Sequence, residues 1–119
     1  MQIVLLSNDL TVVSSVQGVC AKIGATMRTV GNLQQATDAV GAEPVDVVIL
    51  DLSTPQMDVD GLVIAAKSNA GGAPKVIAFG PHVHAERLET ARRAGCDEVV
   101  SRGQFFAQLD VILQRRTSK

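Results

Sequence analysis

The chain contains no tryptophan and no tyrosine, and its 12 acidic and 11 basic residues leave a net charge of −1. Without a basic block, or aromatic rings that stack on bases, the sequence gives little support to recognition of nucleic acid. Apolar runs long enough to cross a membrane are also missing. The first residues lack the charged, apolar and cleavage segments of a secretion signal, so we expect a cytoplasmic protein.

Cysteine is scarce as well. Cys20 and Cys96 are far apart in the sequence, and neither has a second ligand at the spacing that metal sites use. We therefore expect both thiols to be reduced and to pack as small apolar side chains.

The most informative segment that is present is the apolar run Val47–Asp51, which ends on a carboxylate. A short run of this kind, rich in β-branched residues, is typical of a strand buried on both faces of a parallel sheet. In open α/β sheets, ligands and chemistry lie just beyond the carboxyl ends of the strands. Asp51 is therefore the first candidate for a functional residue.

Strand-like runs alternate five times with stretches that carry apolar residues at helical spacing. The expected strands cover 3–6, 27–30, 45–51, 76–79 and 99–100, and the helical stretches cover 12–23, 33–40, 62–66, 85–94 and 105–112, the last as a single helix. This order predicts an α/β fold with a doubly wound, five-stranded parallel sheet. We expect a single domain over residues 1–119 without an output domain, because no linker or repeat divides the chain.

Three segments resemble the receiver domain of bacterial two-component response regulators. Residues 51–55 (DLSTP) are similar to the phosphoacceptor aspartate with a proline four residues later, and 57–61 (MDVDG) resemble the Met-Asp-Gly run that follows. Residues 94–98 (AGCDE) resemble the segment before the fifth strand. The resemblance covers essentially the whole chain and implies a CheY-like, flavodoxin-like sheet with strand order 2-1-3-4-5.

In that family the aspartate accepts a phosphoryl group from a histidine kinase, and two acids after the first strand help it to hold Mg²⁺. The matching positions here are Ser7 and Asn8, which are neutral, and Asp9 follows one residue later. Asp9 fits an N-cap of the first helix better than a metal ligand. Asp9 and Asp51 are the candidate Mg²⁺ ligands, but we expect Mg²⁺ to bind weakly or not at all, and no other cofactor.

The other functional residues of the family are also replaced in this sequence. The position of the switch hydroxyl falls on Gly80, that of the reporting aromatic on Val99, and that of the lysine on Arg102. We expect Arg102 either to contact Asp51 or a phosphoryl group on it, or to be a solvent-exposed loop residue. The hydroxyl of Ser53 can bond the same carboxylate, although stabilising the turn is the simpler role.

These replacements favour a divergent receiver, or pseudo-receiver, which acts by protein–protein interaction and is not an enzyme. In the family, the face built from the fourth helix, fifth strand and fifth helix commonly binds a signalling partner or a second copy. Here it would carry Glu86, Arg87, Arg93, Asp97, Glu98 and Gln108. The alternative is a working phosphorelay receiver, in which a histidine kinase phosphorylates Asp51, Asp9 helps to hold Mg²⁺ and Arg102 replaces the lysine.

A third possibility is a flavodoxin-type cofactor binder. Its phosphate loop would follow the first strand, but residues 7–11 contain no glycine and include an acid. His82 and His84 are two residues apart, a spacing that does not place both on one helical face, so they are a poor metal pair. A role in pH sensing stays open for these histidines.

Overall fold

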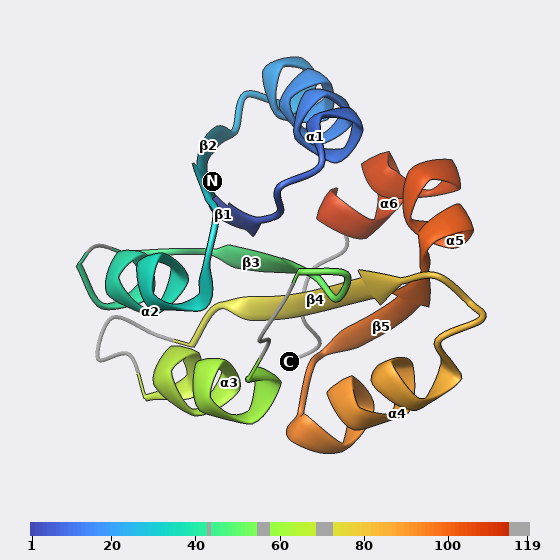
Figure 1. The fold of residues 1–119 in the computed structure, drawn as a ribbon. Helices are drawn as coiled ribbons and strands as arrows, with labels where there is room; N and C mark the ends of the chain where they lie inside the picture. The colour runs from blue at the N-terminus through green and yellow to red at the C-terminus, as the bar shows by residue number, and fades with distance from the viewer. Residues whose placement is uncertain (43, 55–57, 69–72, 115–119) are drawn as a thin grey trace.

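The computed structural model describes residues 1–42, 44–54, 58–68 and 73–114. Pro55 and Met57, which contribute to the resemblance, lie outside the described residues. The chain forms one parallel sheet of five strands in the order β2-β1-β3-β4-β5, with helices on both faces (Figure 1). The fold class and strand order predicted from the sequence are confirmed.

The elements alternate as expected. The strands are β1 (Gln2–Leu6), β2 (Thr26–Val30), β3 (Val47–Asp51), β4 (Lys75–Gly80) and β5 (Glu98–Ser101). The helices are α1 (Leu10–Ile23), α2 (Leu33–Ala42), α3 (Val59–Lys67), α4 (Ala85–Ala94), α5 (Arg102–Ala107) and α6 (Leu109–Gln114). None of the helices within the described ranges has the length and apolar character needed to cross a membrane.

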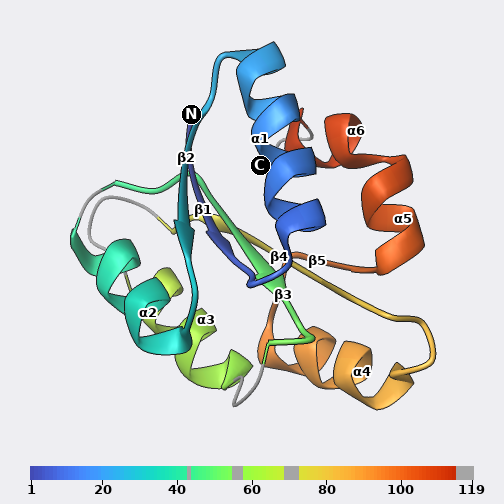
Figure 2. The ribbon, with the colours of Figure 1, turned by 45° about the horizontal axis from the view of Figure 1, so that its top comes forward.

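The sheet separates two apolar clusters, because successive side chains of a strand point to opposite faces. On one face, Val48 and Leu50 of β3 pack with α2, α3 and α4. On the other face, Val47 and Ile49 pack with α1, α5 and α6. Figures 1 and 2 show these two groups of helices on opposite sides of the sheet. By the same alternation, Asp51 belongs to the face of α1, α5 and α6.

Local sequence accounts for the helix ends. Asp9 caps α1, since its side chain accepts a hydrogen bond from the Thr11 amide at 2.8 Å, as its position predicted. Gly24 and Gly95 end α1 and α4 with φ of 76° and 101°, in the left-handed region that glycine enters without steric cost.

The prediction of one last helix is wrong. The chain forms α5 and α6, which meet at Gln108, where φ is −122° and ψ is 20°. The bend lets both pieces face the sheet: Phe105 of α5 stacks on Phe79 of β4, and Ile112 of α6 is fully buried in the same cluster.

Both cysteines are free thiols, as predicted. Cys20 is buried, and burial raises the pKa of its thiol. Cys96 is half-buried, and burial together with the nearby charge of Asp97 raises its pKa to about 11. Since the thiolate is the reactive form, neither is an activated nucleophile at neutral pH.

Candidate functional site

Asp51 ends β3 and is 3 % exposed. Its Oδ1 accepts a hydrogen bond from the Ser53 amide at 3.0 Å, and its Oδ2 accepts one from the Ser7 hydroxyl at 2.7 Å. The Thr54 amide donates to the Asp51 backbone carbonyl at 3.0 Å, which closes the turn after the strand. The carboxylate is therefore fixed by one donor on its own turn and one on the residue directly after β1.

Ser7 lies directly after β1 and is 2 % exposed. Its oxygen donates to Asp51 and also accepts a hydrogen bond from the Asp9 amide at 3.1 Å. The sequence placed Ser7 at an acid position but gave no indication of this bridging role. A buried hydroxyl with both a donor and an acceptor partner is satisfied without a metal ion.

Asn8, at the second acid position, is turned away from Asp51. Its Nδ2 donates to the carbonyl of Gly31 at 3.1 Å, so its side chain ties the β1–α1 connection to the residue after β2. Asn8 is thus a structural link between neighbouring connections.

The expected contact between Arg102 and Asp51 is replaced by a different pair. Arg102, the first residue of α5, places Nη2 at 2.7 Å from Oδ2 of Asp9. Its guanidinium also lies over the Phe106 ring, 5.1 Å from the centroid. The side-chain hydrogen bond from Arg102 is the main cause that lowers the pKa of Asp9 below its ordinary value of 3.8, followed by the Thr11 amide. Asp9 therefore caps α1 and holds α5 at the same time.

This pair predicts the pH dependence of the Asp9→Asn variant. Asparagine still caps a helix, so the substitution removes mainly the charge. Because the folded-state pKa of Asp9 is depressed, the carboxylate stabilises the fold above 3.8 and loses this effect as pH falls through its folded value. We expect wild type to be more stable than Asp9→Asn at neutral pH, and the difference to disappear in acid. Urea unfolding at both pH values measures this; an equal difference in an Arg102→Gln background would contradict it.

Gly80 ends β4 on the face opposite to that of Asp51, by alternation with Ala78. A Cβ added at Gly80 would lie 3.2 Å from Cβ of Leu52 and 3.8 Å from Cδ2 of Leu88. Glycine at this position thus allows the connections after β3 and β4 to approach closely.

The Gly80→Ser variant is therefore expected to be less stable than wild type. Forcing an atom against Leu52 costs about 1–3 kcal/mol, and replacing glycine in a strand returns only about 0.5–1 kcal/mol. Gly103→Ala is the matched control, since a Cβ there meets nothing within 4 Å and alanine favours the helix. Denaturant unfolding should show a loss for the first variant and a gain for the second; a gain in both would refute the crowding at Gly80.

The residues around Asp51 do not fit a Mg²⁺ ion. Mg²⁺ requires several oxygen ligands in octahedral geometry, preferably with more than one carboxylate. The Ser7 hydroxyl is engaged by Asp51, Asn8 faces Gly31, and the Asp9 carboxylate is paired with Arg102. In the part of the chain that is described, no group of three or more His, Cys, Asp and Glu side chains could hold a metal.

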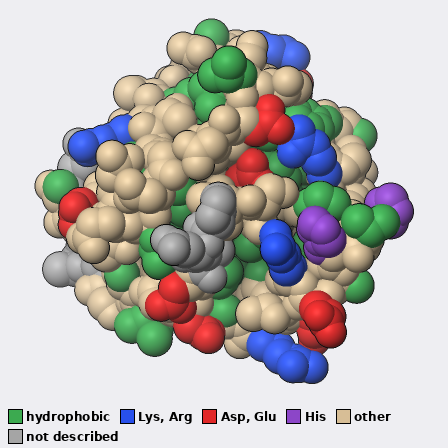
Figure 3. Space-filling view, viewed as in Figure 1, with side chains coloured by type: hydrophobic (Ala, Val, Ile, Leu, Met, Phe, Trp, Pro, Cys, Tyr) green, Lys and Arg blue, Asp and Glu red, His purple; other side chains and the backbone are tan. Residues whose placement is uncertain are grey.

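The residues of the expected partner surface differ in how far they are exposed. Glu86, Arg87 and Arg93 are exposed on α4, although the Arg87 guanidinium also donates to the Leu52 carbonyl at 3.1 Å. Gln108 is exposed between α5 and α6. Figure 3 shows acidic, basic and histidine side chains side by side on the viewed face, so neither sign of charge dominates it.

Two other members of the predicted surface, Asp97 and Glu98, have partners within the domain, although Asp97 is exposed. Asp97 accepts hydrogen bonds from the Val76 amide at 2.7 Å and from Lys67 at 2.8 Å, which joins the start of β5 to β4 and α3. Glu98 is only 14 % exposed and pairs with Lys75, whose side chain is 7 % exposed. Sequence reasoning missed this ion pair, although a lysine opening an apolar strand was a visible sign of one.

The other residues singled out in the sequence analysis lie in turns, at a helix start and in β5. His84 is the N-cap residue of α4 but makes no side-chain capping bond, and His82 is exposed in the preceding turn. Ser53 is exposed and reaches Asp51 through its amide, while Thr54 is buried. Val99 lies in β5 and packs against the cluster of α2, α3 and α4.

No protein-family model matches the sequence, and no curated protein matches it either. Solved structures do match. A response regulator from Hahella chejuensis has 17% identity and a TM-score of 0.81, covering 99% of this chain and 98% of its own. The receiver domain of the sensor histidine kinase PA1611 from Pseudomonas aeruginosa, solved with magnesium in its active site cleft, has 20% identity and a TM-score of 0.78, covering 96% and 94%.

The beryllofluoride-activated receiver domain dimer of NtrC4 has 18% identity and a TM-score of 0.73, covering 92% of this chain and 93% of its own. Structural similarity at sequence identities of 17–20% shows a shared fold. The chain therefore has the CheY-like fold of response-regulator receiver domains over nearly its whole length.

Proposed function

We propose that the chain is a receiver-like signalling module of the cytoplasm that acts through protein–protein contacts, and that it is not an enzyme. The observation that carries the proposal is the setting of Asp51. The carboxylate stands at the end of β3, but its neighbours are the Ser7 hydroxyl and the Ser53 amide, which satisfy both of its oxygens.

Phosphoryl transfer depends on positioning and on neutralising the charge of the group in transit. Around Asp51, Ser7 and Asn8 bring no charge, and the positive charge of Arg102 is paired with Asp9. This arrangement supports a module whose scaffold persists while phosphorylation is slow or absent.

A titration followed by NMR tests the proposal. Wild type and Asp51→Asn are compared by amide spectra, first with Mg²⁺ and then with beryllofluoride, an analogue of the phosphoryl group. We expect the amides of Ser7, Asp51 and Ser53 to respond to neither ligand at concentrations that saturate a typical Mg²⁺ site. Shifts at these amides in wild type that vanish in Asp51→Asn would overturn the proposal.

Such shifts would support the second candidate, a phosphoacceptor receiver. One observation favours it: Asp51 is anchored at the strand end with the geometry of a fixed nucleophile, and Arg102 is a cation on the adjoining helix. In that case a carboxylate oxygen of Asp51 forms a bond to phosphorus, the P–N bond of a kinase phosphohistidine breaks, and the imidazole leaves and takes up a proton. Incorporation of phosphate in wild type but not in Asp51→Asn would identify this function.

The proposed partner is a signalling protein or a second copy of the chain, which contacts α4. Glu86, Arg87 and Arg93 place charges of both signs on the exposed side of this helix, as suits a polar and reversible interface. The NtrC4 receiver domain is a dimer, which supports testing this chain for self-association as well.

A further inference from the structure

A chain of hydrogen bonds runs from Asp51 to the start of α5. The Ser7 hydroxyl donates to Asp51 at 2.7 Å, and the same oxygen accepts the Asp9 amide at 3.1 Å. The Asp9 carboxylate then pairs with Arg102 at 2.7 Å. Ser7 and Asp51 are both at least 97 % buried, so water does not compete with the first bond. Three consecutive contacts thus connect the Asp51 carboxylate with Arg102, the first residue of α5.

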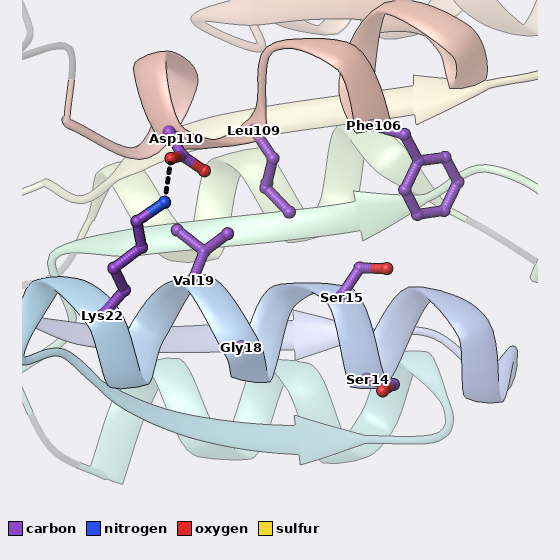
Figure 4. A pocket seen from close by; sticks show the side chains of 8 residues that line it. All are labelled: Ser14, Ser15, Gly18, Val19, Lys22, Phe106, Leu109 and Asp110. Carbon is purple, nitrogen blue, oxygen red and sulfur yellow. Dashed lines mark hydrogen bonds and ion pairs between the residues drawn. The ribbon is translucent and has the colours of Figure 1, made fainter.

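The far end of this chain of contacts lies at an open groove. Arg102 lies over the ring of Phe106, one turn along α5. Phe106 lines a groove of about 360 Å³ between α1 and the pair α5–α6, together with Ser15, Val19 and Leu109 (Figure 4). Lys22 and Asp110 form an ion pair of 2.8 Å across the groove from α1 to α6, drawn as a dashed line in Figure 4.

We infer that Ser7 transmits the state of the Asp51 carboxylate to the Asp9–Arg102 pair, so that the groove between α1 and α5–α6 responds to a change at Asp51. This inference rests on the second candidate function above, in which phosphorylation changes the state of Asp51. It assigns the response to the face of α1 and not to the α4 surface.

The physical reason is that a hydroxyl has a single proton. The Ser7 hydroxyl uses that proton in the hydrogen bond that it donates to Oδ2 of Asp51, and it accepts the Asp9 amide with a lone pair. When Oδ2 no longer accepts, the hydroxyl must turn, and its bond to Asp9 changes with it. Asp9 is both the cap of α1 and the partner of Arg102, so both helix starts are affected.

The Asp51→Asn variant reverses the first bond without any ligand. Both carboxylate oxygens accept, but asparagine accepts with one atom and donates with the other. The Ser53 amide is fixed as a donor, so the asparagine oxygen faces it and the NH₂ faces Ser7. Ser7 then accepts from Asn and its proton turns elsewhere.

The test measures the Asp9 amide, the Arg102 Nε–H and the Phe106 ring protons by NMR in wild type, Asp51→Asn, Ser7→Ala and the double variant. We expect Asp51→Asn to shift all three signals, and the shifts at Arg102 and Phe106 to be lost when Ser7 is alanine. Asp58→Asn, at the N-cap of α3, is the matched control and should leave them in place.

The Arg102→Gln variant breaks the same series of contacts at its last step, between Asp9 and Arg102. It leaves the buried Ser7 unchanged, so its result does not depend on whether the fold tolerates a substitution there. In this background Asp51→Asn should still shift the Asp9 amide but no longer the Phe106 ring. The inference is wrong if Asp51→Asn moves only Ser53 and its neighbours, or if the Phe106 shift persists without Ser7 or Arg102. No metal or phosphoryl donor is present in these spectra, so their outcome is separate from that of the Mg²⁺ and beryllofluoride titration.

Discussion

Replacing Phe105 by alanine is expected to lower the free energy of unfolding by about 3–5 kcal/mol. The ring is fully buried and lies flat against Phe79 of β4, with 4.0 Å between the ring centroids and 9° between their planes. Its removal leaves a cavity in the cluster that joins α1, α5 and α6 to the sheet, and the β4 ring loses its partner. Urea unfolding followed by far-UV circular dichroism measures the change.

Phe106→Ala provides the control for this variant. The neighbouring ring is half-buried and meets Phe105 edge-on at 5.7 Å between centroids. Less apolar surface returns to water when it is removed, so the loss in stability should be clearly smaller. Equal losses in the two variants would show that the stacked ring of Phe105 does not have the central packing role assigned to it.

Replacing Glu98 by alanine is expected to cost about 3–5 kcal/mol, because it leaves the charge of Lys75 inside the protein without its carboxylate. The pair joins the starts of β4 and β5, and the Lys75 ammonium also donates to the Ile112 carbonyl of α6 at 3.3 Å. An ion pair in water would contribute far less, since solvent screens it. Chemical denaturation at neutral pH measures the loss.

Two comparisons establish the cause. The double variant Lys75→Met with Glu98→Leu removes both charges of the pair, and stability should return to within about 1–2 kcal/mol of wild type. Asp110→Ala breaks the exposed pair with Lys22 and should cost at most about 1 kcal/mol. If Glu98→Ala cost no more than Asp110→Ala, the pair would have to be treated as a surface contact.

The fold could be predicted from the sequence because the signals for its strands and helix ends lie within a few neighbouring residues. The run Val47–Asp51 has the burial of a central parallel strand, and every one of its residues is buried. Asp9 as a helix cap and Gly95 as a helix end follow from side-chain chemistry over a few residues. The position of Asp51 at a strand end needed only the order of the elements.

The side-chain contacts within and around the site could not be predicted in the same way. The partner of Arg102 lies 93 positions away, and the sequence pattern suggested Asp51, not Asp9, as the carboxylate that Arg102 would contact. The choice depends on how α5 is oriented over the sheet, which the packing of Phe105 and the bend at Gln108 decide. The partners of Asp97 and Glu98 within the domain were missed for the same reason, because they lie on α3 and β4, more than 20 positions earlier in the sequence.

The two apolar clusters differ in how far apart their members are in the sequence. The buried residues of the cluster under α2, α3 and α4 run from Val4 to Ala91, with Val99 packed against them, whereas those of the cluster under α1 run from Ile3 to Leu113. Chain segments that are distant in sequence lose more entropy when they meet, and contacts between them form more slowly. The side of the sheet that holds Asp51 is therefore complete only when α5 and α6 are docked beside α1.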